Sequence, residues 1–98
     1  MVAIVVSFHP SGMTKAKYDK AIEALEAAGV WPPEGQLSHA CYGEDGDLQV
    51  VDIYDSHEAF DAFGKTLMPI LDTVGIIAGR PEISEVHSCL SVDCQMLR

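Results

Sequence analysis

The stretch Val2-Ala3-Ile4-Val5-Val6-Ser7-Phe8 decides the fold, because it is apolar on both of its alternating faces. Side chains of a β-strand alternate between the two faces of a sheet, so a strand of this kind is expected to be buried from both sides. Pro10-Ser11-Gly12 then ends it. We therefore expect a central strand that needs helices over one face and a second cover over the other.

Two later segments predict the helices that supply the first cover. In the first segment Thr14 is a suitable N-cap and Gly29 a suitable end, and the apolar residues between them share one helical face: Tyr18, Ala21, Ile22, Leu25 and Ala28. In the second segment Ser56 is the cap, with Glu58 in the first turn, and the apolar face is Phe60, Phe63, Leu67, Ile70, Leu71 and Val74. We interpret both faces as core. Pro69 is expected to kink or split the second helix near residues 65–68.

The strands complete a βαββαβ order. Residues 37–42 and 48–54 predict a hairpin around the turn at 43–47, and 83–89 predict the last strand. This order predicts an α+β, ferredoxin-like antiparallel sheet with both helices on one face and the first and third strands in the centre. We expect this domain to span residues 1–90, with a tail at 91–98. Because no helix remains for the open face, we expect the chain to dimerise sheet to sheet.

Charge and cysteine content restrict the partners. Six Lys+Arg against fifteen Asp+Glu give a net charge of −9, which disfavours nucleic acid and anionic membranes. A hydrophobic small molecule or a second protein chain is the expected partner. The chain has three cysteines, an odd number, and they lack CxxC spacing: Cys41, Cys89 and Cys94. This pattern indicates a reducing, cytoplasmic location. We find no signal peptide and no apolar run near the roughly 20 residues that span a bilayer.

The chain resembles the dimeric α/β-barrel superfamily over residues 1–89. The resemblance rests on five segments: Ile4–Phe8, Gly12–Thr14, Val50–Phe60, Phe63–Pro69 and Glu85–His87. It implies a homodimer whose two sheets enclose a cavity. Members include antibiotic-biosynthesis monooxygenases, which oxidise aromatic polyketides without metal or flavin, and relatives that degrade haem, isomerise or decarboxylate. This chain is similar to a functionally unassigned branch.

The haem-degrading branch fits this sequence poorly. That branch uses an Asn, a Trp and a His around the haem, whereas this chain has no Asn and places Trp31 in a Pro-rich connector. We therefore expect no bound cofactor. Metal or haem binding through His39 or His87 stays a minor alternative, with Glu85 two residues before His87 on one strand face. The acidic turn at 43–47 lacks the spacing of a calcium loop.

The candidate catalytic residues are His39, Asp52 and Tyr54. One hairpin register places His39 opposite Asp52, and its other pairs are Leu37 with Tyr54 and Cys41 with Val50. The more apolar set of side chains would then face the helices, namely Ala40, Val51 and Ile53, while His39 and Asp52 point into the dimer cavity. A slip of one residue would separate His39 from Asp52.

In this hypothesis His39 is a general base oriented by Asp52, and Tyr54 donates a hydrogen bond to an enolate or phenolate oxygen. The reaction would be that of a cofactor-independent monooxygenase, isomerase or cyclase acting on a hydrophobic or aromatic molecule. The alternative is a non-catalytic small-molecule-binding or assembly module, in which His39 and Asp52 form only a satisfied polar pair. Cys41 is interpreted as small apolar filler.

Overall fold

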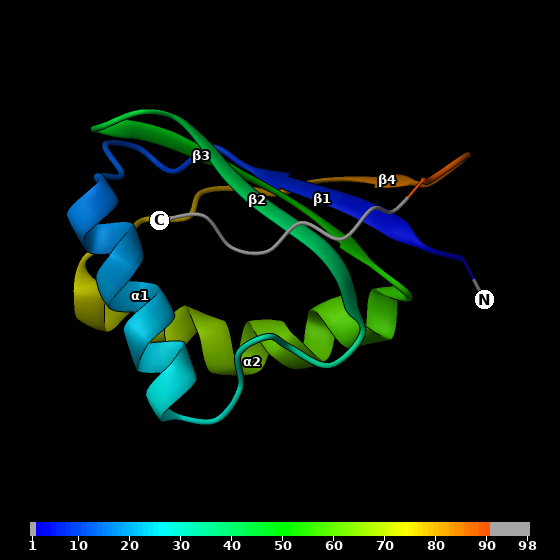
Figure 1. The fold of residues 1–98 in the computed structure, drawn as a ribbon, viewed down its shortest axis with the longest axis horizontal. Helices are drawn as coiled ribbons and strands as arrows, with labels where there is room; N and C mark the ends of the chain where they lie inside the picture. The colour runs from blue at the N-terminus through cyan, green and yellow to red at the C-terminus, as the bar shows by residue number, and fades with distance from the viewer. Residues whose placement is uncertain (1, 91–98) are drawn as a thin grey trace.

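The computed structural model describes residues 2–90. Its elements follow the order β1 (Ile4–Phe8), α1 (Lys15–Ala27), β2 (Gln36–Glu44), β3 (Asp47–Tyr54), α2 (His57–Val74) and β4 (Glu82–Glu85). The strands form one antiparallel sheet in the order β2-β3-β1-β4, and both helices lie on the same face of it (Figure 1). The predicted ferredoxin-like fold, with β1 and β3 in the centre, is confirmed. The predicted tail at 91–98 lies outside the described residues.

Both helices begin at their predicted caps. Thr14 Oγ1 accepts a hydrogen bond from the Lys17 amide at 3.1 Å, and Ser56 Oγ accepts one from the Ala59 amide at 3.1 Å. α2 runs through Pro69 as one helix, so of the predicted kink or split the split is wrong. A proline inside a helix costs about 3 kcal/mol, and burial of the apolar face of α2 against the core offsets that cost.

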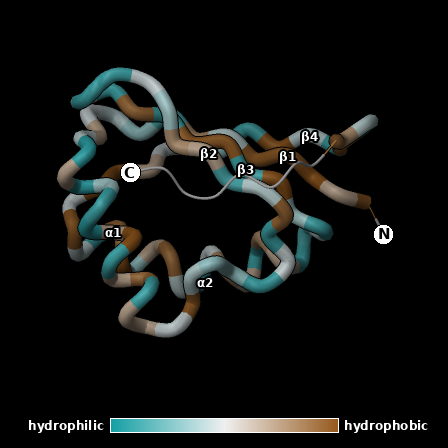
Figure 2. Tube along the Cα trace, viewed as in Figure 1, coloured by the Kyte–Doolittle hydropathy of each residue, from teal (hydrophilic) through white to brown (hydrophobic). Residues whose placement is uncertain are grey.

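The core lies between the sheet and the two helices. Val6 of β1 and Tyr54 of β3 are 0% exposed, and Leu25 of α1 is 1% exposed. β1 is hydrophobic over most of its length (Figure 2), and it places Ile4 and Val6 on the helix side. Because full burial of one such aliphatic side chain is worth about 1.5–3 kcal/mol, this layer holds the sheet and helices together.

The hairpin of β2 and β3 has the predicted register along most of its length. His39 pairs with Asp52 across the two strands, as do Ala40 with Val51 and Cys41 with Val50. An irregularity between Gln36 and Ser38 shifts the end of the ladder, so Gln36 rather than Leu37 lies opposite Tyr54. The predicted Leu37–Tyr54 pair is therefore wrong.

The last strand is shorter than predicted. β4 ends at Glu85, where it pairs with Ile4 at the start of β1. One more backbone bond follows, from the Val86 amide to the Ala3 carbonyl at 2.9 Å. Since β1 is the only neighbour of β4 in the described sheet, pairing ends where β1 begins. His87 lies outside the sheet and is exposed, at the opposite edge from β2.

Candidate active site

His39 and Asp52 lie on the helix side of the sheet. Asp52 is 4% exposed, and Tyr54 on the same face of β3 is fully buried. Val51 and Ile53, which alternate with them, are half-buried on the face that neither helix covers. The expectation that His39 and Asp52 face a cavity between two sheets is therefore wrong. Their polar atoms are paired with one another, which removes most of the cost of placing them in the core.

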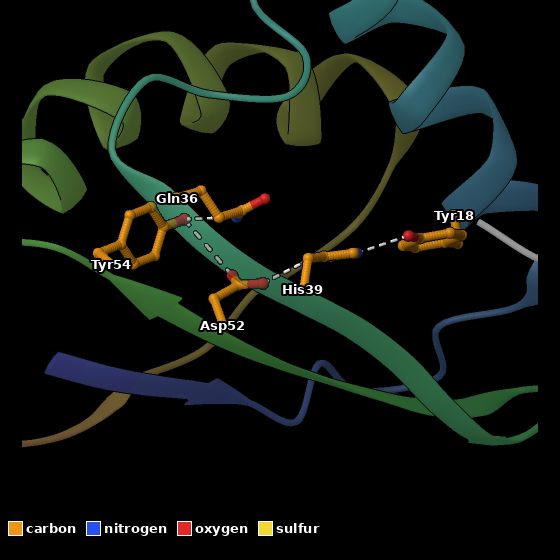
Figure 3. Close-up of polar contacts among 5 residues, drawn as sticks. All are labelled: Tyr18, Gln36, His39, Asp52 and Tyr54. Atoms are coloured by element: carbon orange, nitrogen blue, oxygen red, sulfur yellow. Dashed lines mark hydrogen bonds and ion pairs between the residues drawn. The ribbon is translucent and has the colours of Figure 1, made fainter. Parts of the chain in front are cut away.

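Hydrogen bonds connect five side chains across β2, β3 and α1 (Figure 3). His39 Nδ1 lies 2.5 Å from Asp52 Oδ1, and His39 Nε2 lies 2.6 Å from the Tyr18 hydroxyl. The Tyr54 hydroxyl donates to Asp52 Oδ2 at 3.4 Å and accepts from Gln36 Nε2 at 3.2 Å. Within residues 2–90, every buried side-chain nitrogen or oxygen has a partner.

The partners of His39 define its hydrogen-bonding pattern. An ionised Asp52 carboxylate only accepts, so Nδ1 of the imidazole must carry the proton that it donates. Nε2 of the neutral ring is then an acceptor, and the Tyr18 hydroxyl donates to it. A carboxylate that orients an imidazole in this way stabilises the imidazolium formed when the other nitrogen takes a proton. The arrangement is that of a general base and its orienting group.

Tyr54 holds the Asp52 carboxylate through a hydrogen bond to its second oxygen. Burial, together with the neighbouring Asp52 carboxylate, raises the pKa of Tyr54 well above its usual range, so its hydroxyl keeps its proton and donates to Asp52. Tyr54 is fully buried and is not among the residues that line the adjacent cavity. This geometry favours a positioning role for Tyr54 over direct contact with a ligand.

An apolar cavity of about 70 Å³ lies between the sheet and the helices. His39 and Asp52 form part of its wall, together with Tyr18. The rest of the wall is mainly apolar and includes Ile22, Leu25, Trp31, Phe63, Leu67 and Leu71. The cavity wall thus contains one polar group of residues, from β2, β3 and α1, among mainly apolar side chains.

Tyr18 and Trp31 are the site residues that sequence reasoning missed. Tyr18 was expected to be core, and its place on the sheet-facing side of α1 is correct, but its hydroxyl contacts His39. A tyrosine on a core-facing stripe usually needs a hydrogen-bond partner, and this signal was available in the sequence. Trp31 lies with its ring edge-on to the imidazole, at 4.9 Å between ring centroids. Its position in the connector before β2 gave no such signal.

The other polar candidates have structural partners or no ligand geometry. Burial, with the nearby Asp19 and Asp52 carboxylates, raises the pKa of the Cys41 thiol to about 11, which fits its interpretation as filler. In the acidic turn, Asp45 Oδ1 accepts from the Lys15 amide at 2.9 Å. The part of the chain that the structure describes contains no group of three or more His, Cys, Asp or Glu side chains placed to hold a metal ion. Neither described helix is long and apolar enough to cross a membrane.

Neither a protein-family model nor a curated protein sequence matches this chain. Solved structures do match its fold. A protein from Chloroflexus aurantiacus, described provisionally as an antibiotic biosynthesis monooxygenase, superposes with a TM-score of 0.61 at 14% identity, covering 92% of this chain and 99% of that one. A protein from Caulobacter crescentus with the same provisional description superposes with a TM-score of 0.58 at 20% identity, covering 91% of this chain and 92% of that one.

SnoaB from Streptomyces nogalater, a cofactor-independent oxygenase, superposes with a TM-score of 0.52 at 17% identity, covering 93% of this chain and 95% of SnoaB. At such identities the likeness establishes the fold alone. The chain therefore shares the ferredoxin-like fold of antibiotic-biosynthesis-monooxygenase-like proteins, and the resemblance noted from the sequence is confirmed at that level.

Proposed function

We propose that this protein is a cofactor-independent enzyme that removes a proton from a small hydrophobic molecule held between its sheet and helices. Reactions of the monooxygenase, isomerase and cyclase types share this step. The proposal is supported by one observation: the buried Asp52 holds the His39 imidazole on the wall of an apolar cavity. The similarity in fold to SnoaB, a cofactor-independent oxygenase, agrees with it.

Proton removal creates a positive charge on His39 that the site must stabilise. A positioned general base accelerates proton transfer by about 10²–10⁴-fold. When His39 takes up a proton it becomes an imidazolium, and the Asp52 carboxylate at 2.5 Å stabilises that charge. The side chains of His39 and Asp52 are only 15% and 6% exposed, and this low exposure to water strengthens their interaction.

A second copy of the chain is the proposed cover for the open sheet face. Val5, Ala40, Val51 and Ile53 lie side by side there, since Val5 pairs with Ile53 and Ala40 with Val51. Sheet faces of this composition pack at about 10 Å against another sheet. In this proposal the dimer supports the sheet, while each subunit has its own site. The odd cysteine count and the lack of CxxC spacing support a cytoplasmic location.

A non-catalytic binding module is the second candidate, and the size of the cavity favours it. Its volume of about 70 Å³ lies well below the roughly 300 Å³ at which ligand sites usually begin. Such a space admits a molecule of a few non-hydrogen atoms unless side chains move. In this second function, a binding or assembly module, His39 and Asp52 form only a satisfied polar pair in the core.

Nitroethane distinguishes the two functions, because it is small and has an acidic C–H. The wild-type chain is expected to accelerate exchange of its methylene protons in D₂O, measured by proton NMR, and His39→Gln to reduce this acceleration at least tenfold. His9→Gln is the matched control, since His9 also pairs with an aspartate, Asp47, at 2.8 Å but on the surface. Equal exchange rates in the wild-type and His39→Gln proteins would contradict the enzymatic proposal.

A further inference from the structure

Both ring nitrogens of His39 are occupied by protein groups. Nδ1 bonds to Asp52 and Nε2 bonds to the Tyr18 hydroxyl, so neither nitrogen is open to a ligand in this conformation. Tyr18 itself lines the cavity. The base that the proposed function requires must therefore act through Tyr18, or Tyr18 must move away.

We propose that Tyr18 is the catalytic residue that contacts the ligand, and that His39 and Asp52 activate it. This inference rests on the proposed function and assigns its proton-accepting atom to the Tyr18 phenol oxygen. Tyr18 is in the first turn of α1, which Thr14 caps, so its hydroxyl approaches the β2–β3 pair from the helix layer (Figure 3). Tyr54, the tyrosine chosen from the sequence, is instead fully buried behind Asp52.

The proposed step balances in protons and charge. The Tyr18 O–H bond breaks as its proton moves to His39 Nε2, which leaves a tyrosinate beside an imidazolium that Asp52 stabilises. The tyrosinate oxygen then takes a proton from the ligand, whose bonding electrons stay behind as an anion. Afterwards Tyr18 is a phenol again, His39 is charged and the ligand carries the negative charge. The step needs no oxidant, metal or added group.

The relay extends the reach of His39 into the cavity. The imidazole nitrogens are both bonded to protein groups, whereas the Tyr18 side chain lines the cavity. The net result is the same as direct proton uptake by His39, because the ligand's proton replaces the one that Tyr18 gives to Nε2. The aspartate and histidine hold the displaced proton close by, at 2.6 Å from the phenol oxygen, so that it is returned when the ligand anion is reprotonated.

The test compares Tyr18→Phe, His39→Gln and the double variant in the nitroethane exchange assay. Binding is measured separately from the shift of the indole N–H signal of Trp31, the only tryptophan of the chain and a cavity residue. Tyr18→Phe is expected to reduce the exchange rate at least tenfold while nitroethane still shifts the Trp31 signal. The double variant is expected to be no slower than the slower single variant, since residues that act as one unit are not additive. Tyr42→Phe, which alters an exposed tyrosine of β2, is the control.

Three outcomes separate the two proposals. Loss in both single variants without additivity supports the relay. Loss in His39→Gln with full or faster exchange in Tyr18→Phe overturns the role of Tyr18 but leaves the proposed function, because His39 then meets the ligand directly. Full activity in both variants overturns both.

If Tyr18→Phe does not fold, as judged by circular dichroism, 3-fluorotyrosine introduced at position 18 keeps the hydroxyl and makes it more acidic. The relay predicts that the pH profile of exchange then moves to lower pH. A purely structural Tyr18 predicts an unchanged profile.

Discussion

The two faces of the sheet differ in a way that reverses the usual pattern. The face under the helices contains a hydrogen-bonded group of polar side chains, Tyr18, Gln36, His39, Asp52 and Tyr54, within the core. The face that neither helix covers presents the aliphatic side chains Val5, Val51 and Ile53. Unpaired polar groups in a core are costly, and these groups are tolerated there because they are hydrogen-bonded to one another.

This contrast suggests that the two faces of the sheet have different roles. The helix-side face encloses a cavity and keeps a titratable pair inside it, which suits chemistry on a small molecule. The open face offers aliphatic surface without a charged group at its centre, which suits contact with an identical face. The proposed dimer contact and the proposed site therefore lie on opposite sides of one sheet, whereas the sequence alone suggested that they shared one.

Replacing Val51 by lysine is expected to have the largest effect, because it tests the open face. Val51 lies on the central strand β3, and a symmetric dimer would bury two new charges. At about 2 kcal/mol or more for each lysine, the dimer dissociation constant should rise by about a thousandfold. Analytical ultracentrifugation measures the shift from dimer to monomer.

Ala16→Lys on the exposed side of α1 is the control for that experiment, since it adds the same charge far from the sheet. A wild-type chain that is monomeric, or a dimer that tolerates Val51→Lys as well as Ala16→Lys, would refute the assignment of the open face.

Asp52→Ala tests the helix-side face. The change leaves the imidazole Nδ1–H of His39 and the Tyr54 hydroxyl without their acceptor in a buried place, so the free energy of unfolding should fall by about 3 kcal/mol. Urea denaturation measures it. Asp47→Ala removes an aspartate from an exposed pair with His9, whose side chains are 67% and 55% exposed, and should change stability by less than about 0.5 kcal/mol. Similar losses in the two variants would show that the buried group is not distinctive.

The fold and the His39–Asp52 pair were predictable because both depend on local patterns. Strand alternation and the turn at 43–47 left several registers possible, and the structure has the one that pairs His39 with Asp52. The face was not predictable from the hairpin alone. Ala40, Val51 and Ile53 form the more apolar set, but the polarity of the other set is cancelled by partners such as Tyr18, which is distant in sequence. The irregularity at Leu37 depends on the end of the ladder and has no sequence signal.

Cys41, which lies on the helix-side face of β2 with His39, provides a smaller test of that face. Because burial raises its pKa to about 11, the folded thiol keeps its proton at pH 8 and has about a hundredth of the thiolate of a thiol at the ordinary value of 9.0. Its alkylation by iodoacetamide at pH 8 should be about a hundredfold slower in the folded chain than in guanidinium, measured by peptide mass spectrometry. The raised pKa also means that stability from this group is present below pH 9 and is lost as pH rises towards 11. Equal alkylation rates in the two states would place Cys41 outside the buried layer.

Intermolecular nuclear Overhauser effects between nitroethane and methyl groups test the central claim most directly, because they locate the ligand on one face of the sheet. We expect contacts to Ile22 and Leu25 on the cavity wall, and their loss when a bulky side chain fills the cavity. Contacts to Val5 and Val51 on the open face, without contacts to Ile22 or Leu25, would contradict it.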